Sequence, residues 1–416
     1  MIQRTLTSFK WKSLLSPWQN IDWLLFGLVV GVTAFGGLVI FSTKDGADYY
    51  LKHLSAGLVG IFCAAIIARL RYEVLIHWHW FIYGATNVLL LAVKFFGTRT
   101  NGAQSWLNLG GIEVQPSEFA KLGVIITLAA LLHQRPASTL GAVFRTLAIT
   151  GVPWILIFLQ PDLGTSLVFG AITLGMLFWG GANPGWLILM ISPIASAILF
   201  HVYFPAWCAW LALMALTAWM TLPWKWLSSA IALGINGMVG GFSFYLWEQV
   251  LKDYQKARIT SFLDPSKDAL GTGYHLIQSR IAIGSGELWG RGLNSGTQTQ
   301  LDFIPEQHTD FIFSAVGEEW GFVGCIVLLL AFSMICLRLV IIAVNAQEDF
   351  GSLLAIGVLS MIAFQTILNI SMTIGLAPIT GIPLPFLSYG RSALLTNFLS
   401  LGLVEAVANS RLRSSF

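Results

Sequence analysis

The sequence predicts an all-α protein that crosses a membrane about twelve times. Of its 416 residues, 56% are hydrophobic and only 10% are charged, which leaves too few polar side chains to cover a water-soluble globule of this size. Apolar runs of about 20 residues recur along almost the whole chain, and each is long enough as a helix to cross the hydrocarbon core. Because unpaired backbone amides are costly in lipid, and because a β-barrel would show short alternating segments, we expect these runs to be helices.

The predicted spans follow the apolar runs between chain-breaking residues. They lie near 23–42, 53–70, 74–93, 116–133, 141–159, 163–180, 184–203, 205–222, 227–247, 311–338, 352–374 and 384–407. The segments 205–222 and 227–247 form a tight hairpin, and losing both would leave every other segment on the same side. The first run has no small-residue cleavage site, so it is expected to be a retained span and not a signal peptide.

Basic residues in the short connections predict that both termini are cytoplasmic. The expected inner segments carry Arg4, Lys10, Lys12, Arg69, Arg71, Arg135, Arg145, Lys225, Arg338, Arg411 and Arg413. The expected short outer loops carry only Lys44, Lys52, Lys94 and Arg99. This asymmetry follows the positive-inside rule. Residues 1–22 are then a cytoplasmic segment, and residues 23–416 form one transmembrane domain.

A large connection over residues 248–310 is expected on the outer face. It holds many charged residues and several glycines among short apolar stretches, which favours short interfacial helices and tight turns. A loop longer than about 12–15 residues is usually functional or disordered, so a plain surface linker is the alternative. Shorter outer segments are expected at 94–115, 160–162 and 375–383.

Ionisable side chains gather at the outer ends of the predicted spans. Glu118 and Lys121 follow a turn-forming segment and stand three residues apart, so they share a helix face and can pair. Asp162 opens the sixth predicted span, and Asp310 begins the tenth. Charged groups inside a membrane are costly and by default mark a functional site. Together with Arg391, placed about two turns inside the last span, they predict a charged cavity that opens outward.

Plainer interpretations exist for these residues. Asp162 stands close to a helix start and near a threonine, so it is a candidate helix cap. Glu118 with Lys121 is a candidate structural ion pair. One of Glu318 and Glu319, two turns below Asp310 on the same predicted helix, is a candidate buried structural acid.

The histidines and one tryptophan of the outer segments offer a choice between binding and structural roles. His308 and His275 have no second ligand at metal spacing, so structural or substrate hydrogen bonding is favoured over metal binding. Most of the tryptophans fit an interfacial aromatic belt. Trp106 in the outer segment is kept as a possible contact for a sugar or a lipid.

Several long motifs resemble one known family. They are GAQSWLNLG (102–110), QPSEFAK (115–121), QPDLGTS (160–166), DPSKDALGTGYHLIQSRIAIGSG (264–286), GTQTQLDFIPEQHTDFIFSAVGEEWGFVG (296–324) and GIPLPFLSYGRSALL (381–395). In this order they resemble the SEDS family, named for shape, elongation, division and sporulation. The form GTQTQLDFIPEQHTDFIF is more similar to the RodA elongation branch than to the FtsW division branch.

The resemblance implies a peptidoglycan glycosyltransferase of cell elongation and rod-shape maintenance. Such an enzyme joins lipid II units at the outer face of the bacterial cytoplasmic membrane and works with a class B penicillin-binding protein. By motif position, the essential acid is Asp310, while Glu118, Lys121 and Asp162 line the cavity. Arg391 stands where the family usually has a glycine, so no family role transfers to it. The hairpin at about 205–247 is additional to the usual ten spans of the family.

A glycosyl transfer from a polyprenyl-pyrophosphate donor needs a base and a positive charge. Asp310 is the predicted base for the acceptor hydroxyl. The leaving pyrophosphate would be balanced by basic residues or by a divalent cation such as Mg²⁺ or Mn²⁺; no other cofactor and no nucleic-acid partner are expected. The predicted substrate-binding residues are Glu118, Lys121, Asp162, Trp106, Arg258, Arg280, Arg291 and His308.

Two other classes of function stay open at this point. Charges within a polytopic helical protein also describe a transporter, here a lipid II flippase. Against it, the charges gather at one face, and the inner half offers only Glu73 and Glu405 near helix ends. A scaffold for the wall-building complex would explain a partner surface but not a buried aspartate beside Glu118 and Lys121.

Overall fold

The computed structural model describes residues 21–43, 46–100, 103–110, 112–160, 162–250 and 272–410, together with residues 256, 260, 262 and 264. The long helices of this part are α2 (Trp23–Ser42), α3 (Gly46–Ile67), α4 (Leu75–Phe96), α5 (Pro116–Gln134), α6 (Leu140–Phe158), α7 (Leu163–Trp179), α8 (Pro184–Val202), α9 (Phe204–Thr221), α10 (Lys225–Tyr245), α14 (Ile312–Val344), α15 (Asp349–Ile374) and α16 (Arg391–Ser410). Each corresponds to one predicted span. The predicted all-α class is confirmed.

Ten helices in the described part of the chain are long and apolar enough to cross a membrane. They do not include α7, an apolar helix of 17 residues, or α10. The count of about twelve crossings and the cytoplasmic position of both termini therefore stay predictions. Most of residues 1–22 lie outside the described residues.

Two helix starts differ from the predicted boundaries by seven residues. Helix α3 begins at Gly46 and not at residue 53. Helix α16 begins at Arg391 and not at residue 384, because the preceding segment contains Pro383 and Pro385, which cannot continue a helix. The placement of Arg391 two turns inside the last span is therefore wrong: Arg391 is the first residue of α16.

A small antiparallel sheet occupies the connection between α4 and α5, where only a loop was predicted. Its strands are β1 (Thr98–Thr100), β2 (Ala103–Leu109) and β3 (Ile112–Val114), in the order β1-β2-β3. Asn108 pairs with Glu113 across the β2–β3 turn, where Gly110 adopts φ +63°. Such short strands leave little periodicity in the sequence, and the glycine turn is their main signal. The sheet leads directly into the start of α5.

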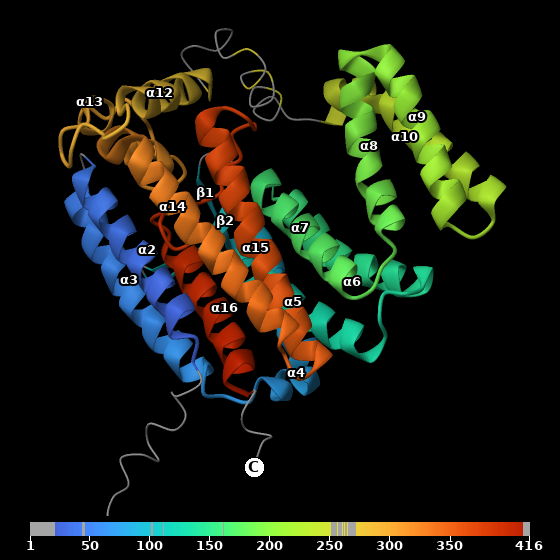
Figure 1. The fold of residues 1–416 in the computed structure, drawn as a ribbon, viewed down its shortest axis with the longest axis horizontal. Helices are drawn as coiled ribbons and strands as arrows, with labels where there is room; N and C mark the ends of the chain where they lie inside the picture. Colours follow the sequence, from blue (N-terminus) through green and yellow to red (C-terminus); the bar gives the residue numbers. More distant parts are fainter. Residues whose placement is uncertain are drawn as a thin grey trace, which may run out of the picture.

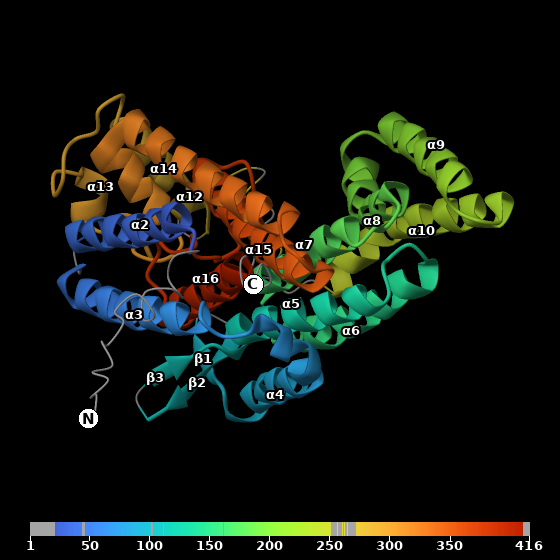
Figure 2. The same cartoon turned by 60° about the horizontal axis from the view of Figure 1, so that its bottom comes forward.

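The main bundle surrounds α5, α15 and α16, whose side chains are largely buried. Helix α3 packs along α16, α2 lies between α3 and α14, and α15 contacts both α7 and α14 (Figures 1 and 2). The apolar core therefore joins segments from both halves of the chain, including Leu128, Phe169 and Phe398. This arrangement brings the starts of α5, α7, α14 and α16 together with the sheet at one end.

Helices α8, α9 and α10 form a separate group beside the main bundle (Figure 2). Hydrogen bonds between polar side chains join them: Asn236 Nδ2 donates to Ser192 Oγ at 3.0 Å, and Trp207 Nε1 donates to Ser196 Oγ at 2.9 Å. Where lipid surrounds helices, such bonds and close packing hold them together. The predicted hairpin is thus two helices that pack on α8.

After the π-helix η3 (Leu246–Val250), the described part of the large connection contains two short α-helices, α12 (Thr272–Ser285) and α13 (Thr297–Gln300). Helix α12 lies against α14 and α15 (Figure 1). The prediction of short helices and tight turns is confirmed there, since Gly290 and Gly292 both adopt positive φ. A small buried apolar cluster is formed by Ala282 of α12 together with Ile304 and Phe311.

Candidate functional site

Asp310 lies in the turn immediately before α14. Its backbone carbonyl accepts a hydrogen bond from Asn369 Nδ2 of α15 at 2.8 Å, and the same amide group donates to the carbonyl of Ile382 at 2.7 Å. A side chain added at Gly381, which has φ +71°, would place its Cβ 3.3 Å from Asp310 Oδ2. Asn369 thus fixes the Asp310 turn against the 375–390 segment, and the carboxylate faces Gly381.

An aromatic cluster adjoins Asp310. The Tyr49 ring of α3 stacks on His308, with centroids 4.1 Å apart and an interplanar angle of 19°. Tyr389 packs edge-on against Tyr49 at 4.9 Å, and its backbone N–H donates to the His308 carbonyl at 2.9 Å. Burial raises the pKa of the Tyr389 phenol, so this group stays protonated near neutral pH. Three distant segments therefore meet at His308.

Glu118 and Lys121 form a buried ion pair in the first turns of α5. Lys121 Nζ lies 2.8 Å from Glu118 Oε2, and the two side chains are 1% and 4% exposed. The pairing expected from their spacing is confirmed. The backbone N–H of Gln115 donates to Ser392 Oγ at 3.1 Å, which ties the start of α5 to the start of α16.

Asp162 caps α7. Its Oδ1 accepts from the Thr165 N–H at 3.0 Å and its Oδ2 accepts from the Thr165 hydroxyl at 2.8 Å, as the capping interpretation predicted. A Cβ at Gly164 would lie 2.5 Å from the Thr380 carbonyl, so the first turn of α7 is in close contact with the 375–390 segment. Asp162 therefore lies next to the same 375–390 segment as Asp310, and both of its oxygens are engaged in the cap. We call Asp162, Asp310 and the 375–390 segment the rim.

The remaining predicted binding residues are more dispersed. Arg280 is exposed on α12 and donates from Nε to the Ile374 carbonyl at 3.2 Å, at the end of α15. Arg291 is exposed and donates to the Ser285 carbonyl at 3.2 Å. Trp106 is half-buried on β2, opposite Thr98.

Arg258 lies outside the described residues. The contacts of Arg280 and Arg291 with backbone carbonyls are structural, and their binding of substrate stays a prediction.

Four residues of the site were not singled out from the sequence as site residues: Tyr49, Asn369, Tyr389 and Ser392. Tyr389 and Ser392 stand in the motif at 381–395, which was a usable signal. Tyr49 and Asn369 had none, because each reaches the site only through the packing of α3 and α15. Arg391, two residues after Tyr389, is the first residue of α16. Its positive charge partly offsets the rise in the pKa of the Tyr389 phenol that burial causes.

The described residues contain no group of three or more His, Cys, Asp and Glu side chains that could hold a metal ion. Asp162, next to the same 375–390 segment as Asp310, already accepts hydrogen bonds with both carboxylate oxygens. Mg²⁺ and Mn²⁺ prefer several carboxylate or carbonyl oxygens. The described residues thus supply no complete ligand set, and a divalent cation bound among them would need oxygens of the substrate.

Chemically, the site combines an aspartate that faces a glycine with neighbouring aromatic rings, and a buried ion pair lies in the first turns of α5. An aspartate can accept a proton from a hydroxyl, and aromatic rings suit the apolar faces of sugars.

Comparison with known proteins gives a consistent result. Residues 15–412 match the family model FTSW_RODA_SPOVE, described as cell cycle protein. The chain is 33% identical over 395 residues to the peptidoglycan glycosyltransferase MrdB of Escherichia coli strain K12, covering 94% of each chain. It is 33% identical over 427 residues to the peptidoglycan glycosyltransferase RodA of Treponema pallidum, covering 94% of this chain and 98% of that relative.

Solved structures share the fold. The Thermus thermophilus rod shape determining protein RodA superposes with a TM-score of 0.63 at 26% identity, covering 95% of this chain and 98% of that one. A chain from a peptidoglycan synthase complex, described as coordinating polymerization and crosslinking, gives a TM-score of 0.73 at 28% identity and covers 95% and 99%.

Proposed function

The chain belongs to the FtsW/RodA/SpoVE family, and from this premise we propose that it polymerises lipid II into glycan strands at the outer face of the cytoplasmic membrane. It is a multi-pass membrane protein and a peptidoglycan glycosyltransferase of the RodA type, with a role in cell elongation. The observation that carries the site assignment is the position of Asp310, whose carboxylate faces Gly381 at the rim where four helices begin.

In the proposed reaction, Asp310 accepts the proton of an acceptor sugar hydroxyl. The hydroxyl oxygen then bonds to the anomeric carbon of the donor sugar, and the bond from that carbon to the pyrophosphate oxygen breaks. The bonding pair leaves with the polyprenyl pyrophosphate. The missing side chain at Gly381 leaves room for the hydroxyl beside the carboxylate. Asn369 holds the turn that carries Asp310.

The positive charge for the leaving pyrophosphate would come from Lys121 and from Arg391 at the start of α16. Lys121 is paired with Glu118 at 2.8 Å, so the pair is nearly neutral until a substrate phosphate competes for the ammonium group. The Tyr49, His308 and Tyr389 rings would contact the sugars. A divalent cation bridging substrate oxygens is compatible with this arrangement.

We also propose that the protein works in the inner membrane of a bacterium with a class B penicillin-binding protein. The support is its similarity to a chain of a synthase complex that couples polymerization to crosslinking. The apolar, lipid-facing helices would let the polyprenyl tails stay in the bilayer during the reaction.

The decisive test supplies purified protein with lipid II, first in detergent and then in sealed vesicles. Glycan strands are the expected product, and a class B penicillin-binding protein should raise their yield. Redistribution of lipid II between leaflets without polymer would instead identify a flippase. If neither glycan strands nor redistribution were seen, a scaffold role would remain and the proposed activity would be contradicted.

A further inference from the structure

Helix α14 is interrupted at Gly321, where φ is +62° and ψ is −161°. The break frees backbone groups on both sides, and the connection at 286–292 pairs with them. The N–H groups of Arg291 and Gly292 donate to the carbonyls of Glu318 and Glu319 at 2.9 and 3.0 Å, and the N–H groups of Phe322 and Val323 donate to the carbonyls of Glu287 and Leu288 at 2.9 and 3.1 Å. Each of the four groups therefore has a partner.

Glycines make this close approach possible. A Cβ at Gly286 would lie 1.9 Å from the Gly317 carbonyl oxygen, and one at Gly290 would lie 2.1 Å from the Glu319 carbonyl oxygen. Real Cβ atoms do not approach so closely, so the connection is held directly on the helix break. The break presents two buried acids, Glu318 and Glu319, to this connection.

The Glu318 carboxylate is fully buried and holds the start of α13. Its Oε1 accepts from the Gln298 N–H at 2.8 Å and from the Thr297 hydroxyl at 3.3 Å, and its Oε2 accepts from the Thr299 N–H at 3.0 Å. Arg291 Nη1 donates to the same Thr297 hydroxyl at 3.0 Å. These donors compensate the buried charge and fix residues 297–299 on α14.

Glu319 holds the same segment by an indirect route. Its Oε2 accepts from the Ser42 hydroxyl at the end of α2 at 2.7 Å, and the carbonyl of Ser42 accepts from the Gln300 side-chain amide. Residues 297–300 are therefore tied both to α14 and to α2.

From there the contacts lead to Asp310. The buried Gln307 side chain donates from Nε2 to the Thr299 carbonyl at 3.0 Å, so Thr299 joins Glu318 through its N–H and Gln307 through its carbonyl. Gln307 stands three residues before Asp310, and the intervening turn is closed by the Thr309 N–H donating to the Glu306 carbonyl at 3.1 Å.

We propose that Glu318 is a positioning residue, whose carboxylate sets the place of Asp310 through Thr299 and Gln307. This rests on the proposed function of Asp310. Replacing the carboxylate leaves buried amides unpaired, so the segment would shift while the membrane helices stay in place. A displacement of about 1 Å at a reacting group can cost about 100-fold in rate.

The test compares Glu318→Gln with wild type in lipid II polymerisation, amide hydrogen exchange and thermal unfolding. A glutamine turns an NH₂ group towards one of the two N–H donors, so it cannot replace both oxygens. We expect kcat to fall about 10- to 100-fold with KM within about twofold. Exchange should rise in peptides over 296–310 and stay unchanged elsewhere. Glu287→Gln, an exposed acid of the same connection, is the control and should behave as wild type.

Thr297→Val is the milder second variant, in case Glu318→Gln does not fold. It removes one donor to Glu318 and should give a smaller fall in kcat with the same local rise in exchange. Wild-type kcat in folded Glu318→Gln, or a loss of rate without local exchange, would overturn the positioning role. Hydrogen exchange reports the order of the 296–310 segment independently of catalytic activity. An inactive wild type would therefore contradict the proposed function and not the structural link from Glu318 to this segment.

Discussion

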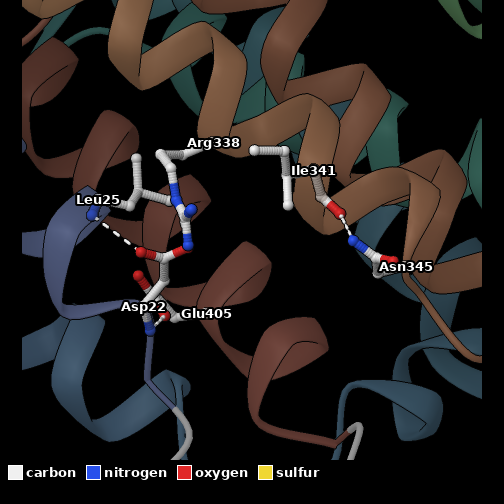
Figure 3. Close-up of polar contacts among 6 residues, drawn as sticks. All are labelled: Asp22, Leu25, Arg338, Ile341, Asn345 and Glu405. Carbon is white, nitrogen blue, oxygen red and sulfur yellow. Dashed lines mark hydrogen bonds and ion pairs between the residues drawn. The ribbon is translucent and has the colours of Figure 1, made fainter.

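Arg338 on α14 donates from Nε to Asp22 Oδ2 at 2.9 Å, and its Nη2 lies against the same oxygen (Figure 3). Asp22 Oδ1 accepts from the Leu25 N–H at 3.1 Å, which caps α2. The Asp22 backbone N–H donates to Glu405 Oε2 of α16 at 2.9 Å. One residue thus joins α2, α14 and α16 at the end of the bundle away from Asp310.

Asp22→Asn should destabilise the bundle and leave the chemistry intact. Asparagine still caps a helix, so the main loss is the charge that pairs with Arg338. Because the Arg338 side chain is 32% exposed, solvent screens part of this loss, and we expect about 1–2 kcal/mol. Thermal unfolding in detergent measures it against Asp349→Asn, an exposed acid. An unchanged midpoint would mean that the pair contributes nothing to stability.

Asp310→Asn should abolish polymerisation in a folded protein. An amide cannot take the acceptor proton, while the backbone carbonyl of residue 310 keeps its bond from Asn369. Polymerisation by the purified variant, with Glu287→Gln alongside, gives the measurement. If the variant made strands at the wild-type rate, Asp310 would not be the base. A large drop in thermal stability would instead indicate a structural role.

Gly381→Ala tests the space beside the carboxylate. The new Cβ would lie 3.3 Å from Asp310 Oδ2, in a backbone conformation with φ +71° that alanine adopts at a cost of about 1 kcal/mol. We expect polymerisation to fall about tenfold, because the methyl group takes room needed by the acceptor hydroxyl. Gly181→Ala shares the positive φ, at +89°, and meets no atom within 4 Å, so it is the matched control. Equal rates for both variants would show that the acceptor does not use this space.

The sequence predicted best what depends on neighbouring residues. Long apolar runs predicted the helices, the i, i+3 spacing predicted the Glu118–Lys121 pair, and Asp162 was recognised as a possible cap of its own helix. The interruption at Gly321 was hidden, because α14 reads as one continuous apolar run. Its left-handed conformation arises from pairing with a connection about 30 residues earlier.

Contacts between distant segments could not be predicted in the same way. The stacking of Tyr49 on His308 and the approach of Gly381 to Asp310 depend on how α3, α15 and α16 pack. Nothing in the local pattern around Tyr49 distinguishes it from an interfacial tyrosine. Family motifs reduced this gap for Asp310, because long matched strings locate site residues without predicting their contacts.

Variants of the buried pair of Glu118 and Lys121 can distinguish a structural role of Lys121 from a role in substrate binding. Lys121→Met alone leaves the Glu118 carboxylate buried without its cation, and breaking such a pair costs about 3–5 kcal/mol. The double variant Glu118→Gln with Lys121→Met removes both charges, so most of that stability should return. If Lys121 also contacts the substrate phosphate, polymerisation should stay low in the double variant although the protein is stable. Recovery of both stability and rate, measured by thermal unfolding and strand synthesis, would show that the pair serves only the fold.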